Sequence, residues 1–321
     1  MRAICLEQNT VHFQRNHPAP TVGEGEVLID VIQAGICETD LQLVRGYMEF
    51  SGILGHEFVG RATFGDFQGR RVVGEINCNC KKCIRCHSGF GNHCANRTVV
   101  GIFKHDGAFA EQVAIPQSSL HFIPDSITDD QAVLIEPLAA ALEIGTQMDL
   151  SVIRKAIVLG DGRLAYLCAL AISEKVKDLS VVGKHDLKLE RFRKLGMEAI
   201  KLDDLECEKA FDLVVDCTGS VTGLPLALEL VEPRGTIVMK TTVVDQHQLS
   251  LAPIVIDEVK LLGSRCGPFD QAIAMLEAGR VNLTGLITNR FPLEAAQEAF
   301  QAAVDPAAFK VVFELNGASV T

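Results

Sequence analysis

The sequence lacks the long apolar runs that carry a chain into or across a membrane. Its longest apolar stretches, such as AIVLG and LVVDCTG, are far shorter than the roughly 20 residues of a membrane-spanning helix. The first residues, MRAICLEQNTVHFQRNHP, carry polar or charged side chains every few positions and contain no apolar core of signal-peptide type. We therefore expect a cytoplasmic protein without a membrane partner.

An excess of positive charge is also missing. The chain has 30 Lys and Arg residues against 41 Asp and Glu residues, a formal net charge of -11. Nucleic acids and anionic membranes are bound by basic surfaces, so this balance argues against both as partners. With 321 residues, of which 48% are hydrophobic, the chain can bury a large core and exceeds the usual size of one domain. These properties fit a soluble two-domain enzyme with a small-molecule substrate.

Two patterns of strands and helices follow one another along the chain. In the first part, short strands such as GEVLIDVIQAGI and GRRVVGEI alternate apolar and polar residues between glycines, which indicates a β-rich, barrel-like domain. From Thr128 a helical pattern begins, and apolar strands then alternate with amphipathic helices. This alternation predicts a doubly wound parallel sheet and therefore an α/β protein. The tail adds two helices and a last strand, KVVFEL.

The segment AIVLGDGRLAYLCAL contains a glycine-rich fingerprint, with Gly160, Gly162 and Ala165 in the order GxGxxA. The first glycine permits a tight turn, the second lets a pyrophosphate approach the backbone, and the small third residue lets the helix pack on the strand. Strand-end glycines are also common in plain turns, but the strand before and the helix after favour a dinucleotide site. Arg163 and Leu164, which open the helix, are included in this predicted site.

The choice between NAD and NADP depends on the end of the next strand, in LSVVGKHDLKLE. An acid there would bond the ribose hydroxyls of NAD, but the strand ends at Gly183 and continues with Lys184 and His185. Space and positive charge favour NADP. The alternative is a solvated helix-cap turn, with Asp186 or another group serving NAD.

Two further residues are weaker candidates for the cofactor site. Thr218 follows an apolar strand, where a plain strand-end turn is almost as good an interpretation. Arg265, in LLGSRCG, could reach the cofactor or form a structural salt bridge.

The loop CNCKKCIRCHSGFGNHC concentrates cysteines in a chain that we expect in a reducing compartment. Cys80, Cys83, Cys86 and Cys94 have the spacing CxxCxxCx7C, which suits a tetrahedral Zn²⁺ with no open position for substrate. A structural zinc is therefore predicted, with an iron site or chance clustering as alternatives. Cys78 is left over.

A second set of possible ligands is scattered along the chain, and each member has an ordinary structural interpretation. Cys37 could be a core thiol, His56 a turn residue, and Glu136 a helix surface charge. Together with Glu57, these groups would form an open zinc site of the catalytic kind. Sequence spacing alone does not show that they meet.

The motifs AGICETD, GHEFVG, the cysteine loop, GAFAEQVAI, EPLA and VLGDGRLA follow one another in a characteristic order. In this order the chain resembles the zinc-dependent medium-chain dehydrogenases of the alcohol dehydrogenase superfamily, in particular their sorbitol and threonine dehydrogenase-like branches. The resemblance implies a GroES-like β-barrel catalytic domain of residues 1–137 and 267–321. A Rossmann domain of residues 138–266 would be inserted in it.

The resemblance also implies roles for the scattered residues. Cys37 and His56 match the catalytic zinc ligands. Glu57 and Glu136 match two carboxylates that bind the metal directly or through its water, and which of them does so here stays open. The implied chemistry is reversible oxidation of a secondary alcohol or polyol, in which zinc lowers the pKa of the alcohol and NAD or NADP accepts the hydride.

Other positions match the resembled family or depart from it. Asp40 matches a residue that supports the zinc-binding histidine, and Thr39 matches a hydroxyl that passes the alcohol proton onward. Where many relatives have a proton-relay histidine, this chain has Gln42, which does not titrate. Arg70 replaces a usual acid before the cysteine loop.

The resemblance implies a homodimer or homotetramer. Two alternative functions stay open at this point. One is a reductase that acts mainly on aldehydes or ketones with NADPH. The other is a nicotinamide-binding protein that has lost turnover, although the full set of zinc ligands argues against it.

Overall fold

A computed structural model describes residues 1–243, 245–246 and 248–315. The chain forms two compact units. One consists of Met1–Glu136 with the described residues from Phe269 onward, and the other of Pro137–Pro268. These limits differ by one or two residues from the expected domains of 1–137 with 267–321 and of 138–266, and the last six residues of that expectation lie outside the described residues.

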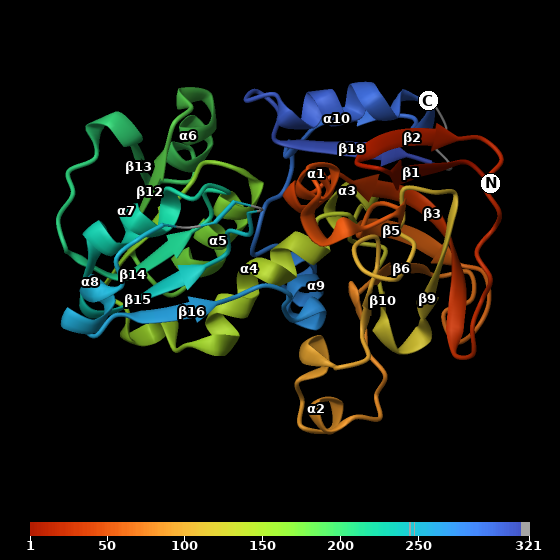
Figure 1. Ribbon diagram of the computed structural model, residues 1–321, viewed down its shortest axis with the longest axis horizontal. Helices are drawn as coiled ribbons and strands as arrows, with labels where there is room; N and C mark the ends of the chain where they lie inside the picture. Colours follow the sequence, from red (N-terminus) through yellow and green to blue (C-terminus); the bar gives the residue numbers. More distant parts are fainter. Residues whose placement is uncertain (244, 247, 316–321) are drawn as a thin grey trace. The chain divides into compact units, whose positions relative to one another are not determined.

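The unit Pro137–Pro268 is built on a six-stranded sheet in which every strand pairs parallel to its neighbours. Its strand order is β13-β12-β11-β14-β15-β16 (Figure 1). This is the order 3-2-1-4-5-6 of a doubly wound dinucleotide-binding sheet, and it confirms the predicted fold class. The strands are β11 (Lys155–Leu159), β12 (Asp178–Gly183), β13 (Glu198–Lys201), β14 (Phe211–Asp216), β15 (Val231–Met239) and β16 (Lys260–Gly263).

The central strands of this sheet are buried because their sequences are continuous apolar runs. In β11 and β14 the last four residues are all buried, as expected where helices cover both faces of a sheet. The helices between the strands are α5 (Arg163–Ser173), α6 (Asp186–Arg193), α7 (Gly223–Leu230) and α8 (Ala252–Ile256). The helix α4 (Ile135–Gln147) precedes β11. In the part of the chain that the structure describes, no helix combines the length and the apolar character required to cross a bilayer.

The other unit is mainly antiparallel β structure. A seven-stranded sheet has the order β10-β6-β5-β3-β18-β17, with β9 also paired to β3, and a three-stranded sheet has the order β2-β1-β4. The strands β7 and β8 form a separate pair. The strands are β1 (Ala3–Glu7), β2 (Thr10–Gln14), β3 (Glu26–Gly35), β4 (Gly52–Ile53), β5 (Glu57–Ala62), β6 (Arg71–Gly74), β7 (Asn77–Cys78), β8 (Thr98–Val99), β9 (Gln112–Pro116), β10 (Leu120–Phe122), β17 (Ile287–Phe291) and β18 (Lys310–Glu314).

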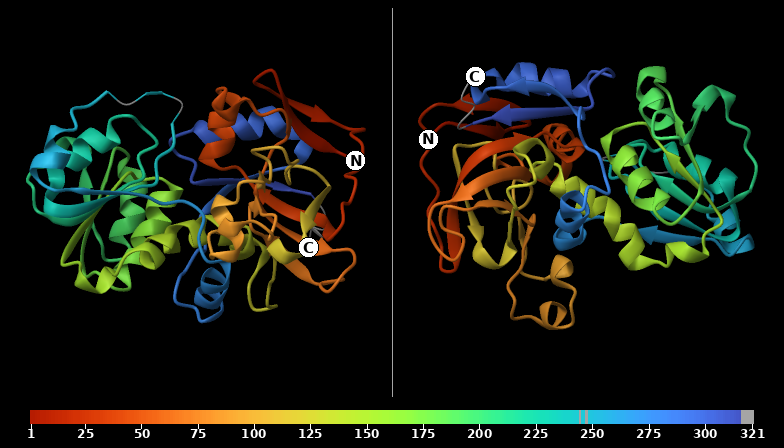
Figure 2. Two further views of the ribbon diagram at one scale, coloured as in Figure 1. Left: turned by 60° about the horizontal axis from the view of Figure 1, so that its bottom comes forward. Right: turned by 180° about the vertical axis from the view of Figure 1, so that it is seen from behind.

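In the described part of this unit there are five α-helices, and aromatic side chains pack against one of them, α10. They are α1 (Glu38–Val44), α2 (Ile84–His87), α3 (Asp129–Ala132), α9 (Phe269–Glu277) and α10 (Ala296–Val304). The helix α10 and the strand β18, both dark blue, lie side by side in Figure 2. Phe109 packs edge-on against Phe313 and Phe300, with ring centroids 4.9 and 6.3 Å away. These contacts join β18 and α10 to the barrel core.

The register of three strands brings distant segments together. Strand β3 pairs antiparallel with β5, where Gly35 lies opposite Glu57. On its other side β3 pairs antiparallel with β18, where Gly35 lies opposite Val312. Strands β5 and β18 therefore flank the end of β3 on its two sides, where the chain continues toward Cys37.

The helix α9 is linked to the barrel by a histidine between two carboxylates. Nε2 of His121 lies 3.0 Å from Oε1 of Glu75, and Nδ1 of the same ring lies 2.8 Å from Oδ1 of Asp270. It also stacks on Phe269, with centroids 5.1 Å apart. Burial lowers the pKa of His121, but the bonds to both carboxylates outweigh it and raise the pKa above its ordinary value.

This raised pKa predicts a pH-dependent contribution of His121 to stability. The protonated ring contributes fully below the unfolded-state pKa of about 6.5 and loses its contribution as the pH rises through the folded-state pKa. We expect His121→Gln to lower the free energy of unfolding by a few tenths to about 1 kcal/mol at about pH 5.5, and by much less at about pH 9. Urea unfolding at the two pH values measures this, with the exposed His12→Gln as control. An equal loss at both pH values would mean that packing, and not charge, links α9 to the barrel.

Candidate metal centres and cofactor loop

The first candidate centre begins with Cys37, the residue before helix α1. Its backbone is extended, with φ -102° and ψ 162°, and its N–H donates to Oδ2 of Asp40 at 2.8 Å. Asp40 therefore fixes the start of the helix, and with it the position of the cysteine. The hydroxyl Oγ1 of Thr39 lies 3.9 Å from the Cys37 sulfur.

His56 and Glu57 reach the same place from the start of β5. Both side chains are buried, each with 2% exposure. One ligand atom from each of Cys37, His56 and Glu57 lies within 4.8 Å of the others. The structure thus brings together three groups whose sequence spacing does not predict a meeting. Glu136, half-buried near the start of α4, is not in this group of three described residues.

Asp40 lies behind the imidazole of His56. Its Oδ1 atom is 3.4 Å from Nδ1 of His56, and both side chains are almost completely buried. Among the described residues, neither of these two atoms has a well-aligned hydrogen-bond partner. The contact leaves Nε2 as the nitrogen that can bind a metal, the arrangement in which a carboxylate orients a metal-binding histidine.

The charges of this group favour the metal-binding form of Cys37. Burial raises the pKa of the Cys37 thiol, but the hydrogen bond and the charge of His56 outweigh burial and lower the pKa below its ordinary value. Burial likewise lowers the pKa of His56, and Asp40 and Cys37 raise it well above its ordinary value. A thiolate, an imidazole and a carboxylate form the ligand set of an open zinc site, so these residues fit a catalytic zinc.

Lys310, on β18, completes this centre and was missed in the sequence. Its side chain is 1% exposed, its ammonium pairs with Oε2 of Glu57, and it donates to the carbonyl of Ile36 at 3.1 Å. A Cβ at Gly35 would lie 2.7 Å from Nζ of Lys310, so glycine makes room for the lysine. Burial lowers the pKa of Lys310 to about 8, against the opposing charges of Cys37 and Asp40. In the sequence, the feature that could have pointed to Lys310 is a lysine at the start of an apolar strand.

Two departures from the resembled pattern have local structural roles. Gln42 is buried, and its Nε2 donates to Oε1 of Glu38 at 2.8 Å. The guanidinium of Arg70 lies over the ring of Phe122, 3.4 Å from its centroid.

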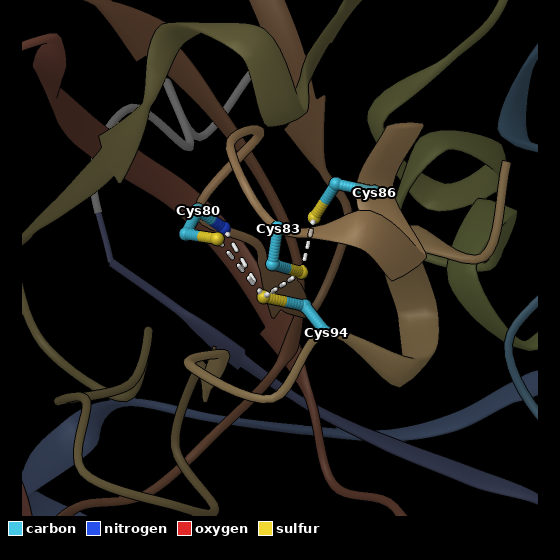
Figure 3. A group of neighbouring side chains, drawn as sticks. All are labelled: Cys80, Cys83, Cys86 and Cys94. Atoms are coloured by element: carbon cyan, nitrogen blue, oxygen red, sulfur yellow. Dashed lines mark hydrogen bonds between the residues drawn. The ribbon is translucent and has the colours of Figure 1, made fainter. Parts of the chain in front are cut away.

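The second candidate centre is the cysteine loop around α2, drawn in Figure 3. Its sulfur atoms lie 3.5 Å apart for Cys83 and Cys86, 3.7 Å for Cys83 and Cys94, and 3.4 Å for Cys94 and Cys80. A tetrahedron of thiolates around zinc, with Zn–S bonds of about 2.3 Å, has edges of about 3.8 Å. The four sulfurs therefore fit one zinc ion as a closed ligand shell.

The thiols of this loop differ in acidity. The backbone N–H of Lys82 and the thiol of Cys94 lower the pKa of Cys80 to about 6, whereas burial and the neighbouring thiols raise the pKa of Cys86 to about 12. Cys78 lies on β7, outside the group of four, and burial raises the pKa of its thiol to about 12. A bound cation would favour the thiolate form of all four, because metal binding releases the thiol protons.

The glycine fingerprint lies between β11 and α5. Gly160 has φ +116°, and a Cβ there would lie 2.7 Å from the carbonyl oxygen of Cys217, so the turn requires glycine. A Cβ at Gly162 would meet nothing within 4 Å, which leaves the space before the helix open for a ligand. Ala165 is buried against the sheet, whereas Arg163 and Leu164 are half-buried on the first turn of α5. These features fit a pyrophosphate at a helix N-terminus.

An acid that was not among the predicted site residues lies at the end of β12. Oδ2 of Asp161 accepts the backbone N–H of Lys184 at 2.7 Å and that of His185 at 2.8 Å. Nδ1 of His185 lies 3.0 Å from the same oxygen. A Cβ at Gly183 would lie 2.6 Å from this oxygen, so the carboxylate occupies the space that a side chain at 183 would need. In the sequence, the feature that could have pointed to Asp161 is its place between the fingerprint glycines Gly160 and Gly162.

The two weaker cofactor candidates occupy different environments. Thr218 is held by Asp216, whose Oδ1 accepts its N–H at 2.9 Å and its hydroxyl at 2.8 Å. Asp216 also accepts the hydroxyl of Thr241 at 2.9 Å, so it organises the turn after β14. Arg265 is exposed, and its carbonyl accepts Nζ of Lys240 at 3.3 Å.

Comparisons with known proteins agree with this architecture. Residues 23–125 match the family described as alcohol dehydrogenase GroES-like domain. The chain is 26% identical to a sorbitol dehydrogenase of Halalkalibacterium halodurans, over 97% of this chain and 98% of that protein. It is 27% identical to an L-threonine 3-dehydrogenase of Anaeromyxobacter sp. (strain K), over 99% of this chain and all of that protein.

A solved structure extends the agreement to three dimensions. It is a short chain alcohol dehydrogenase from E. coli CFT073 complexed with NADH, with a TM-score of 0.89 and 25% identity. The alignment covers 98% of this chain and 99% of that one. With the strand order and the two cysteine-containing centres described above, these matches show that the chain is similar, over nearly its full length, to the zinc-dependent medium-chain dehydrogenases/reductases of the alcohol dehydrogenase superfamily.

Proposed function

We propose that this protein catalyses the reversible oxidation of a secondary alcohol or polyol, with zinc at Cys37, His56 and Glu57 and NAD or NADP as hydride acceptor. The observation that supports this most is the convergence of these three ligand types at one place, where His56 and Glu57 are buried and Cys37 is half-buried. The relatives named above act, by their names, on a polyol and on a hydroxy amino acid, which are both alcohols. Reduction of the corresponding ketone is the same reaction in reverse.

The chain's own residues would hold and orient the reacting groups. When bound, zinc supplies a Lewis acid that polarises the carbon–oxygen bond of the substrate. Cys37 and His56 hold the metal, and Asp40 keeps the imidazole in position. Glu57 is the third ligand in this proposal, although its pairing with Lys310 partly satisfies its charge. Glu136 is the alternative carboxylate.

Proton transfer would start at the hydroxyl of Thr39, whose Oγ1 lies beside the Cys37 sulfur. A hydroxyl can accept and donate a hydrogen bond at the same time, so it can pass a proton without holding charge. Gln42 does not continue this path, because its amide does not titrate and is bonded to Glu38. The proton would therefore pass from Thr39 to water.

Metal analysis tests the proposal. We expect about two zinc ions per chain, one in each centre, falling to about one in Cys37→Ser and to about one in Cys83→Ser. All eleven cysteines are free, as expected in a reducing compartment such as the cytoplasm that we propose. If wild type itself holds only about one zinc per chain, and Cys37→Ser does not lower that content, the result would instead support a binding protein without turnover. A screen of alcohols with NAD and NADP in parallel would then identify the substrate class.

We also propose a homodimer formed through β16. This strand is the edge of the parallel sheet, and an edge offers unpaired backbone groups to another chain. Exposed apolar side chains lie on and near it, with 44% exposure for Leu261, 75% for Val255 and 77% for Ile256. Light scattering after size exclusion should give two chains for wild type and one for Leu261→Lys with Ile256→Asp. A tetramer, or a dimer unaffected by these changes, would contradict this interface.

A further inference from the structure

The end of β12 is the place where a doubly wound sheet distinguishes two forms of a dinucleotide. In such folds an acid about 20 residues after the fingerprint binds the ribose 2′-hydroxyl of NAD and opposes the 2′-phosphate of NADP. Here the strand ends at Gly183, and the acid is missing from that position. The carboxylate of Asp161 occupies the same space from the neighbouring loop, because it lies against Gly183 where a side chain would project.

We propose that Asp161 makes this protein select NAD(H) over NADP(H), by placing a fixed carboxylate at the end of β12. The proposal rests on the proposed function, since it concerns the cofactor of that reaction. It replaces the expectation of NADP, which depended on the absence of an acid at Gly183 and the presence of Lys184 after it.

The hydrogen bonds of Asp161 give the first reason. The N–H groups of Lys184 and His185 are the backbone donors at the strand end, and both point to Oδ2 of Asp161, at 2.7 and 2.8 Å. A 2′-phosphate would need donors of this kind, but here they are already bonded. Among the described residues, the contact given for Oδ1 of Asp161 is the longer one of 3.2 Å to the His185 ring, so this oxygen keeps lone pairs for a ribose hydroxyl.

Charge and rigidity give the second reason. Asp161 is 8% exposed and is held on two sides, so its charge stays in one place. The imidazole of His185 faces Asp161 at 3.0 Å, and this contact holds the ring toward the carboxylate. Lys184 is exposed, and a solvated ammonium on a flexible stem contributes less than a fixed neighbouring charge. A second negative group, the 2′-phosphate, would therefore meet net repulsion at this place.

Asp186 is the competing acid, since it opens helix α6 in the same loop. Its side chain is 66% exposed, and its Oδ2 is paired with Nζ of Lys201 at 3.0 Å. Its charge is thus partly compensated and more strongly screened by solvent. This difference makes Asp186 a matched control, because neutralising it removes the same charge from the same loop.

The test measures dissociation constants for NADH and NADPH by calorimetry, without a substrate. Wild type should bind NADH more tightly than NADPH. Asp161→Asn keeps the shape of the side chain and removes its charge, and it should change the ratio of the two constants by on the order of tenfold in favour of NADPH. Asp186→Asn should leave the ratio within about twofold of wild type.

Each outcome has a separate meaning. Tighter binding of NADPH by wild type overturns the proposal without any variant, so a folding defect in Asp161→Asn cannot rescue it. A ratio that changes in Asp186→Asn and not in Asp161→Asn assigns the selection to the other acid. Failure of wild type to bind either dinucleotide contradicts the proposed function as well. Melting temperatures with and without NADH show whether each variant is folded.

Discussion

Replacing Cys37 by serine or His56 by alanine is expected to lower kcat on the order of a thousandfold or more, because each change removes one of three ligands of an open zinc site. Dinucleotide binding should stay within about twofold of wild type, since the glycine fingerprint lies in the other compact unit. Steady-state kinetics with the identified alcohol and titration with NADH measure the two quantities. Zinc content, measured on the same samples, should fall by one ion per chain.

A matched control separates this effect from the loss of any buried thiol. Cys5 is a buried cysteine in the same unit, on β1, and lies outside both groups of possible metal ligands. Cys5→Ala should therefore keep its zinc and most of its turnover. If Cys37→Ser loses NADH binding and turnover to the same degree, Cys37 has a role in folding, and the assignment of the metal site to this cysteine is wrong.

The fold could be predicted because its signals are local. Apolar strands that alternate with amphipathic helices specify a parallel sheet, and the fingerprint around Gly160 marks its first strand. The observed strand order follows from the same pattern. The grouping of the loop cysteines could be predicted for the same reason. The four lie within one short segment, so the chain itself holds their sulfur atoms close together.

The grouping of Cys37, His56 and Glu57 could not be predicted in this way, because it depends on strand register. His56 and Glu57 reach Cys37 only because β5 pairs with β3 at Gly35. Lys310 reaches the same place from a strand 274 residues beyond Ile36, the residue whose carbonyl it contacts. No periodicity in the sequence reports such a pairing. The order of motifs shared with the resembled family indicated four candidate ligands, of which the structure groups all but Glu136, and it did not indicate the lysine.

Asp161 was missed for a related reason. The prediction searched for an acid in the strand β12, where the general pattern places it, and found Gly183. The structure supplies the carboxylate from a neighbouring loop, and the glycine is what makes room for it. The carboxylate of Asp161 therefore explains why position 183 is a glycine, although the two residues lie in different segments.

Replacing Lys310 by methionine is expected to give the largest loss of stability. The change removes the buried ammonium that pairs with Glu57, whose side chain is 2% exposed. Breaking a buried ion pair from one side leaves an uncompensated charge, which costs about 3–5 kcal/mol. Urea unfolding of zinc-free protein should show a loss of this size in the free energy of unfolding. With zinc bound the loss should be smaller, because the carboxylate then has a second cationic partner.

The double variant Lys310→Met with Glu57→Gln shows whether the loss comes from the unpaired carboxylate. Removing both charges leaves no buried ion, so most of the stability of the zinc-free protein should return. Glu57→Gln alone leaves the ammonium of Lys310 without its carboxylate partner. That ammonium still donates to the carbonyl of Ile36, so this variant should lose less stability than Lys310→Met. If the double variant is as unstable as Lys310→Met, the lysine acts through packing between β3 and β18. The pairing with Glu57 would then contribute little, and Glu57 would be available to the metal at all times.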